Sequence, residues 1–219
     1  MSAAPQAAWL EPALAALRDG RAVAYPTETL YGLGVDAGSE HAVARLLAWK
    51  GRAASQPLTI LVVGAAALDA LGISLPAAGR ALAEAFWPGP LTLVLPAHRP
   101  FATGIGRGDG AVGVRCSSHP VAAALAARLA REGVTITSTS LNRTGAPPAR
   151  TRAEARAVCG AGADAPLLVD APDMPEPAGV ASTVVDVTAP APRLLRRGAV
   201  AREDLERVVG ALLCEGAPA

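Results

Sequence analysis

Apolar residues along the chain follow two spacings, one typical of helices and one typical of buried strands. Residues 120–132 and 202–213 repeat apolar side chains every three to four positions, which places these side chains on one face of a helix. Short unbroken apolar runs at 58–63 and 91–95 indicate buried strands. The pattern therefore predicts helices interleaved with strands.

The same criteria predict elements along nearly the full length of the chain. Helices are expected at 9–19, 39–49, 65–71, 77–86, 120–132, 151–158 and 202–213, and strands at 21–25, 58–63, 91–95, 111–116, 134–138, 167–170, 182–187 and 193–195. We expect Ser39 to cap the second helix. Gly20 and Gly51 are expected to end the first two helices, because glycine readily adopts a left-handed backbone.

Strands that alternate with helices indicate an α/β fold. We expect a single domain over residues 1–219, with its core at about 9–213. The domain is expected to contain a twisted mixed sheet that is largely parallel and is flanked by helices. No internal repeat or low-complexity linker interrupts this pattern.

Composition excludes several classes of protein. No apolar run reaches the roughly 18 residues of a membrane span, and the N-terminus lacks the pattern of an export signal, so we expect a cytoplasmic protein that does not engage a membrane. Cys116, Cys159 and Cys214 are far apart, which argues against a disulfide framework and a CxxC pair. The net charge of +1 is too small to identify a nucleic-acid binder.

The basic residues are 19 arginines and a single lysine, Lys50. An ammonium is a compact point charge, unlike the planar guanidinium. A single lysine is therefore a candidate for chemistry that arginine performs poorly. The alternative is that it survived by chance, and the sequence leaves both interpretations open.

Polar side chains follow most of the predicted strands. In open α/β sheets, ligands bind beyond the carboxyl ends of the strands. The residues at these positions are Thr27, Glu28, Thr29, Tyr31, Arg115, Ser138, Ser140, Asn142, Ser182, Thr183, Arg196 and Arg197, joined by Lys50 and Arg52 from a helix end. Cations, hydroxyls and amides together suit a polyanionic ligand. Taken singly, each residue could instead form a local turn bond or a solvated charge.

Standard phosphate and catalytic motifs are absent or incomplete. There is no Walker A loop, and Gly32, Gly34 and Gly38 miss the dinucleotide spacing GxGxxG by one residue. The glycine-rich segment 104–110 indicates a mobile loop rather than a pyrophosphate site. No Ser-His-Asp arrangement supports covalent catalysis. Three histidines lack metal-binding spacing and are expected at the surface or as helix caps: His41, His98 and His119.

Taken together, these residues resemble the YrdC-like family of threonylcarbamoyl-AMP synthases. The resemblance is carried by YPTETLYGLGVDA from Tyr25, Lys50-Gly-Arg52 with Pro57-Leu58, WPGPLTLVL from Trp87, VGVRC with His119-Pro120, STSLN with Gly145, STVVD from Ser182 and LLRRG ending at Gly198. The paired signatures Lys-x-Arg and Ser-x-Asn are short. Their order along the chain, together with the PTET and WPGPLT segments, makes the resemblance specific.

The resemblance implies a nucleotidyltransferase that forms threonylcarbamoyl-AMP and pyrophosphate from L-threonine, bicarbonate and ATP. ATP would be a substrate accompanied by Mg²⁺, without a protein metal site and without a tightly bound cofactor. The product would pass to a transferase complex that modifies adenosine 37 of tRNA. The implied fold is a twisted mixed sheet whose concave face holds the site, in the short form of the family.

Position by position, the resemblance also implies roles for individual residues. ATP binding falls to Lys50, Arg52, Gln56, Ser140, Asn142 and Arg196, with Lys50 and Arg52 also catalytic. Threonine binding falls to Thr29, Arg115, Ser138 and Ser182, with Arg115 facing the carboxylate, which a guanidinium fork fits. The chain departs from the family pattern at Gln56 in place of asparagine, at Leu61 in place of a histidine that some members have, and at Pro148 in place of a serine.

Two other functions fit the same residues. A protein of this fold could bind double-stranded RNA or tRNA without synthase activity, and weak RNA binding could also accompany the synthase. The aromatic content of this chain is 3%, which leaves few aromatic side chains for stacking with the bases of single-stranded nucleic acid. A relative acting on another carbamoyl compound, like the carbamoyltransferase maturation factors, would normally carry additional domains.

Overall fold

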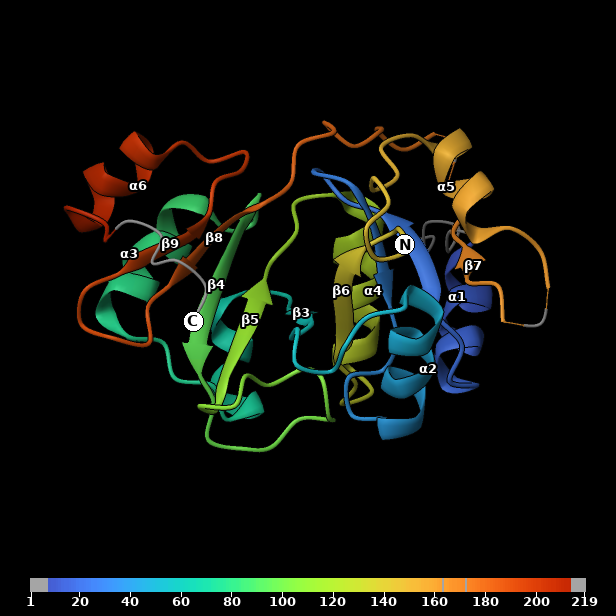
Figure 1. Cartoon of the computed structure of the whole chain (residues 1–219), viewed down its shortest axis with the longest axis horizontal. Helices are drawn as coiled ribbons and strands as arrows, with labels where there is room; N and C mark the ends of the chain where they lie inside the picture. Colours follow the sequence, from blue (N-terminus) through green and yellow to red (C-terminus); the bar gives the residue numbers. More distant parts are fainter. Residues whose placement is uncertain (1–7, 163, 172, 214–219) are drawn as a thin grey trace, which may run out of the picture.

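The computed structural model describes residues 8–162, 164–171 and 173–213, and the strands within these ranges form one continuous sheet (Figure 1). The strand order is β7-β1-β2-β6-β3-β5-β4-β8-β9. The strands are β1 (Val23–Pro26), β2 (Tyr31–Gly34), β3 (Thr59–Leu61), β4 (Leu91–Pro96), β5 (Ala111–Arg115), β6 (Ile136–Ser140), β7 (Leu167–Leu168), β8 (Thr183–Asp186) and β9 (Arg193–Arg196).

Helices flank the sheet along its whole width (Figure 1). They are α1 (Leu10–Arg18), α2 (Glu40–Lys50), α3 (Ala77–Phe86), α4 (Pro120–Ala130), α5 (Arg152–Cys159) and α6 (Arg202–Val209), with two 3₁₀ turns, η1 (Ala65–Ala67) and η2 (Asp69–Leu71). The α/β fold with flanking helices is therefore confirmed.

Two apolar clusters lie on opposite faces of the sheet. Along β1, Val23 and Tyr25 belong to the cluster that packs beneath α1 and α4. Ala24, between them, belongs to the cluster that contains residues of α2, α3 and α6. Successive side chains of a strand point to opposite faces, so a strand buried on both sides reads as an unbroken apolar run.

The predicted helix boundaries at α1 and α2 are confirmed. The Ser39 hydroxyl accepts a hydrogen bond from the Ala42 N–H at 3.2 Å and so caps α2. Gly51 ends α2 with φ of 65°, and Gly20 follows α1 with φ of 68°. These left-handed conformations are costly for residues with a side chain.

The sheet is mixed, as predicted, but the expectation that it is largely parallel is wrong. Three pairings are parallel, namely β1–β7, β3–β5 and β4–β8, and five are antiparallel. Helical connections between strands favour parallel neighbours. Instead, β6 enters between β2 and β3 and runs antiparallel to both, because a helical connection does not fix the direction of the strand that follows it.

Strand β2 was not predicted, because its two glycines suggested a turn. Gly34 allows β2 to approach β6 closely, since a Cβ built on it would lie 2.3 Å from the carbonyl oxygen of Thr137. A Cβ on Gly32 would lie 3.0 Å from the Tyr25 ring. The glycines that lower strand propensity are therefore what this position in the sheet requires.

Three other predicted elements differ in extent. Strand β6 begins two residues later than expected, because the Val134 N–H returns to the carbonyl of Leu129 at 3.0 Å and closes the end of α4. The predicted helix at 65–71 is a pair of 3₁₀ turns, and α6 ends early at Gly210, whose φ is 77°. After α3, the peptide bond between Trp87 and Pro88 is cis.

In the part of the chain that the structure describes, no helix combines the length and apolarity needed to cross a bilayer. Cys116 and Cys159 are buried and free. Cys214 lies outside the described residues.

Gly34→Ala should destabilise the fold, because the added methyl group has no room between β2 and β6. Overpacking of this kind costs about 1–3 kcal/mol, and more where backbone atoms cannot move. The matched control is Gly108→Ala, where nothing lies within 4 Å of the added carbon. Denaturant unfolding measures both variants, and equal midpoints would contradict the close approach of the two strands.

Candidate functional site

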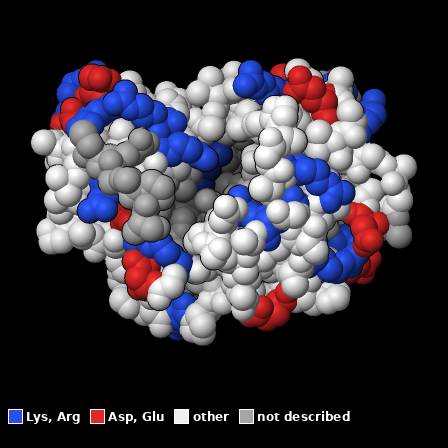
Figure 2. Space-filling model, in the orientation of Figure 1, with Lys and Arg blue, Asp and Glu red and all other residues white. Residues whose placement is uncertain are grey.

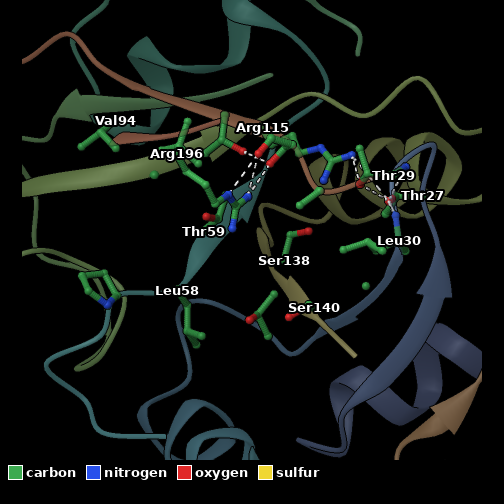
Figure 3. Close-up of a pocket in the computed structure, with 18 of the residues that line it drawn as sticks. Thr27, Thr29, Leu30, Leu58, Thr59, Val94, Arg115, Ser138, Ser140 and Arg196 are labelled. Carbon is green, nitrogen blue, oxygen red and sulfur yellow. Dashed lines mark hydrogen bonds between the residues drawn. The ribbon is translucent and has the colours of Figure 1, made fainter. Parts of the chain in front are cut away.

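A polar cavity of about 420 Å³ opens over the sheet, lined by residues of β2, β3, β4, β5, β6, β8 and β9 and their adjoining loops. Figure 2 shows a hollow in this face of the molecule with basic side chains at its edge. The close-up in Figure 3 shows hydroxyl and guanidinium groups that reach the cavity from opposite sides.

Seven of the ten predicted site residues line this cavity. They are Thr29, Arg52, Arg115, Ser138, Ser140, Ser182 and Arg196. The remaining three, Lys50, Gln56 and Asn142, are not among its lining residues. The structure thus brings together residues separated by up to 167 positions in the sequence, from Thr29 to Arg196.

The loop between β1 and β2 is shaped by the hydroxyl of Thr27. This oxygen donates to the carbonyl of Leu30 at 2.6 Å and accepts from the N–H groups of Thr29 and Leu30, each at 3.2 Å. Threonine and serine hydroxyls commonly stabilise turns in this way. This turn holds the Thr29 hydroxyl 2.9 Å from the Thr27 hydroxyl, at the wall of the cavity.

Arg115 ends β5 and lies against this loop. Its Nη2 donates to the Thr29 hydroxyl at 2.6 Å and forms an ion pair with Glu28 Oε1 at 3.0 Å. Arg115 is 7% exposed. A nearly buried arginine that still lines a cavity is suited to bind an anion that enters it.

The opposite wall carries Arg196, at the end of β9. Its Nε and Nη2 donate to the carbonyl of Ser182 at 3.1 and 2.9 Å, and Nη2 also donates to the Ser182 hydroxyl at 2.9 Å. That hydroxyl lies 2.9 Å from the Thr92 hydroxyl. Partial burial, followed by the positive charges of Arg115 and Arg52, lowers the pKa of Arg196.

Arg52 follows α2 and is held by backbone oxygens. Its Nε donates to the carbonyl of Gln56 at 2.8 Å and its Nη2 to that of Pro57 at 3.1 Å. Burial lowers the pKa of Arg52. Within the described residues, neither Arg52 nor Arg196 forms an ion pair with a carboxylate, so the charges of both remain uncompensated.

Lys50 is buried beside the cavity, with its ammonium turned to the loop after β6. Nζ donates to the carbonyls of Ser140 and Asn142 at 2.6 and 2.9 Å and to the Asn142 side-chain oxygen at 3.1 Å. These bonds use all three ammonium donors. Burial, followed by the charge of Arg52, lowers the pKa of Lys50 to about 8. A direct bond to a ligand would require release of one of these three.

The remaining residues of that loop are also held in place. Asn142 accepts from the Ser140 hydroxyl at 2.7 Å and donates to the carbonyl of Ala146 at 2.8 Å. The guanidinium of Arg143 lies 4.1 Å from the ring centroid of Trp49. Gln56, by contrast, is exposed.

Four polar residues of the cavity were not among the sequence candidates: Thr59, Thr92, Arg107 and Thr139. Thr59 and Thr92 interrupt otherwise apolar strands, which was an available signal. Arg107 lies in the glycine-rich segment 104–110 and pairs with Asp186 at 2.7 Å and Asp109 at 2.6 Å. Its role depends on a fold that brings this loop to β8.

Several sequence candidates have structural roles instead. Thr183 donates to the carbonyl of Val200 at 2.7 Å. His119 caps α4, as one of the two predicted roles, because its Nδ1 accepts from the Val121 N–H at 3.2 Å. Leu61 lies in the apolar core and does not line the cavity, whereas Pro148 does.

No group of three or more histidine, cysteine, aspartate and glutamate side chains in the described ranges could hold a metal ion. The chemistry that the cavity itself offers is anion binding by guanidinium groups and orientation by hydroxyls.

The chain is similar to known proteins in sequence and in fold. Residues 15–198 match the Sua5/YciO/YrdC family model, which carries the description "Telomere recombination". A Halorhodospira halophila protein named threonylcarbamoyl-AMP synthase is 42% identical over 153 residues, which cover 70% of this chain and 78% of that protein.

A Pyrococcus abyssi protein of the same name is 38% identical over 195 residues, which cover 89% of this chain and 55% of that protein. The solved structure of Pyrococcus abyssi Sua5 complexed with L-threonine has a TM-score of 0.84 and 35% identity, over 94% of this chain and 58% of that chain. The present chain therefore spans little more than half of the Pyrococcus protein.

Lys50→Met should loosen the loop after β6, because three oxygen atoms lose a donor. Loss of hydrogen bonds from a charged donor costs about 1.5–3 kcal/mol each, and the amides of residues 141–146 should exchange hydrogen faster. Arg45→Met is the control, since Arg45 lies on the same helix with its side chain 38% exposed and its ion pair at the surface. Hydrogen exchange that is equally fast in both variants would contradict the structural role of Lys50.

Proposed function

The chain belongs to the Sua5/YciO/YrdC family, and from this premise we propose that it is a threonylcarbamoyl-AMP synthase. Its substrates are L-threonine, bicarbonate and ATP, and its products are threonylcarbamoyl-AMP and pyrophosphate. The observation that carries this proposal is the cavity. Arg52 and Arg196 line it with positive charges that no carboxylate compensates, and Arg115 lines it among hydroxyl groups. Such a site suits two anionic substrates at once.

The reaction needs positioning rather than a protein nucleophile. The threonine nitrogen forms a bond to the carbon of bicarbonate, and water leaves to give a carbamate. A carbamate oxygen then attacks the α-phosphorus of ATP, the bond to the bridging oxygen breaks, and pyrophosphate leaves. Both reactants are anions that repel each other, so fixed cations lower the cost of bringing them into line.

At the threonine end, Arg115 binds the carboxylate, and Thr29, Ser138 and Ser182 orient the rest of the amino acid. Arg115 supports this assignment because its guanidinium is fixed by Thr29 and still lines the cavity. The related structure of Pyrococcus abyssi Sua5 complexed with L-threonine supports threonine as the amino acid.

At the nucleotide end, Arg52 and Arg196 bind the triphosphate and stabilise the charge that develops on the leaving pyrophosphate. Ser140 also lines the cavity. Lys50 acts through the loop that it holds, which carries Ser140 and Asn142. Gln56 contributes its backbone oxygen to Arg52, so the assignment of its side chain to ATP has no geometric support.

We further propose that Mg²⁺ arrives with ATP and is bound by phosphate oxygens and water. Glu28, Asp109 and Asp186, the carboxylates paired with cavity arginines, are already engaged. We also propose that the chain forms a single domain and that the protein is cytoplasmic. Its product would pass to a tRNA threonylcarbamoyl transferase complex.

RNA binding is the second candidate function, and one observation favours it. Outside the main cavity, a depression of about 390 Å³ is lined by Arg21, Arg45, Trp49 and Arg143 among others. Arginines beside an aromatic ring suit phosphates and a stacked base. Binding of tRNA that weakens on Arg143→Ala, in a protein that releases no pyrophosphate, would favour this function over synthesis.

The proposed activity predicts pyrophosphate release from ATP only when threonine and bicarbonate are both present. The substrate assignment would be contradicted if pyrophosphate were released as fast with serine, or with no amino acid, as with threonine. A continuous pyrophosphate assay with each substrate omitted in turn checks this.

Arg52→Ala should reduce turnover by about 10²–10³-fold, because one preorganised cation at the developing charge is lost. The fold should persist, since the lost hydrogen bonds go to a loop at the surface. Arg80→Ala, at an exposed position of α3 outside the cavity, is the control and should retain full activity. Equal activity of the two variants would refute the proposed position of the triphosphate.

A further inference from the structure

Glu28 is a partly buried carboxylate behind the wall of the cavity. Its side chain is 17% exposed, and it does not line the cavity itself. Its Oε1 lies 3.0 Å from Arg115 Nη2, and its Oε2 accepts a hydrogen bond from the Ser117 hydroxyl. Ser117 is fixed in turn, because its oxygen accepts from the His119 N–H at 3.2 Å at the start of α4.

Glu28 is ionised at neutral pH. Burial alone would raise its pKa, but the charge of Arg115 and the hydrogen bond from Ser117 lower the pKa below its ordinary value. The backbone around it is also anchored, since the Ala178 N–H donates to the carbonyl of Glu28 at 3.1 Å and the Gly179 N–H to that of Thr29 at 2.8 Å. A fixed negative charge therefore stands directly behind Arg115.

The guanidinium of Arg115 is only partly used by these contacts. Thr29 and Glu28 both engage Nη2, while Nε is buried and has no hydrogen-bond partner in the described part of the chain, and neither has Glu28 Oε1. An unpartnered buried donor is costly unless a ligand completes it. The guanidinium thus keeps donor capacity beyond its contacts with Thr29 and Glu28.

The arginines of the cavity differ in their local charge. Arg115 is neutralised by Glu28, whereas Arg52 and Arg196 have carbonyl oxygens as partners and keep their full charge. Figure 3 shows Arg115 turned toward Thr27 and Thr29 and Arg196 on the other side of the cavity. A multiply charged anion is drawn to the uncompensated pair, and repelled by the carboxylate beside Arg115.

We infer that Glu28 is a positioning residue that reserves Arg115 for the amino-acid carboxylate and keeps polyphosphate away from it. This inference rests on the proposed synthase function. The carboxylate holds Nη2 in place, lowers the net charge at that end of the cavity, and so separates the binding places of two substrates that are both anions. No part of this role requires Glu28 to touch a substrate.

Glu28→Gln removes the charge and nearly preserves the shape of the side chain. We expect the KM for threonine to rise about tenfold or more, with the KM for ATP within about twofold, because only one end of the cavity changes. Inorganic tripolyphosphate should become competitive with threonine in this variant and not in the unaltered protein. A loss of folded protein would lower kcat without separating the two KM values.

Ser117→Ala and Glu132→Gln complete the experiment. Ser117→Ala leaves the charge and loosens its orientation, so the KM for threonine should rise without competition by tripolyphosphate. Glu132→Gln removes another ion-paired carboxylate, one that pairs with Arg18 and Arg128 outside the cavity, and should change neither KM value.

The outcomes separate this inference from the function on which it rests. If the unaltered protein releases no pyrophosphate with threonine, bicarbonate and ATP, the proposed function fails. If it does, and Glu28→Gln leaves the KM for threonine and the tripolyphosphate pattern unchanged, the role of Glu28 is refuted. Should Glu28→Gln fail to fold, an unchanged KM for threonine in Ser117→Ala refutes it instead.

Discussion

The continuity of the sheet depends on β6, which pairs with β2 along one edge and with β3 along the other. The close approach on the β2 side requires the missing side chain of Gly34. It is reinforced by Thr137, whose hydroxyl accepts from the Val35 N–H at 3.0 Å and whose carbonyl accepts from the Tyr25 hydroxyl at 3.1 Å. Because β6 also carries Ser138 and Ser140, the same pairing that joins the two halves of the sheet places hydroxyls on the floor of the cavity.

Backbone carbonyls, rather than carboxylates, hold most of the cations of the site. Lys50, Arg52 and Arg196 each donate to two or more oxygens of nearby residues, and each of the three includes backbone carbonyls among its partners. A carbonyl dipole orients a cation without cancelling its charge. The site is therefore preorganised and still positive, which is the condition under which fixed charges stabilise an anionic transition state.

Two arginines of the cavity depart from that arrangement. Arg115 pairs with Glu28, and Arg107 pairs with Asp109 and Asp186. The pair with Asp186 attaches the glycine-rich loop to β8. Hydrogen bonding to Asp109 is the largest of the effects that raise the pKa of Arg107. The Arg115 pair lies at the end of the cavity assigned to threonine. Differences in local compensation thus give chemically identical side chains different local charge within one cavity of about 420 Å³.

The sequence by itself determined the alternation of strands and helices, the caps at Ser39 and Gly51, and seven of the residues that line the cavity, out of ten that were predicted for the site, because periodicity, capping and strand-end position are local properties. Only the tertiary structure decided the direction of strand pairing and the presence of β2, since both depend on which distant backbone lies alongside. It also decided that the Lys50 ammonium turns to the carbonyls of Ser140 and Asn142, and that Arg107, Thr59 and Thr92 reach the cavity. Side-chain partners from remote segments carry no signal in any short stretch of the chain, so their roles were fixed by packing.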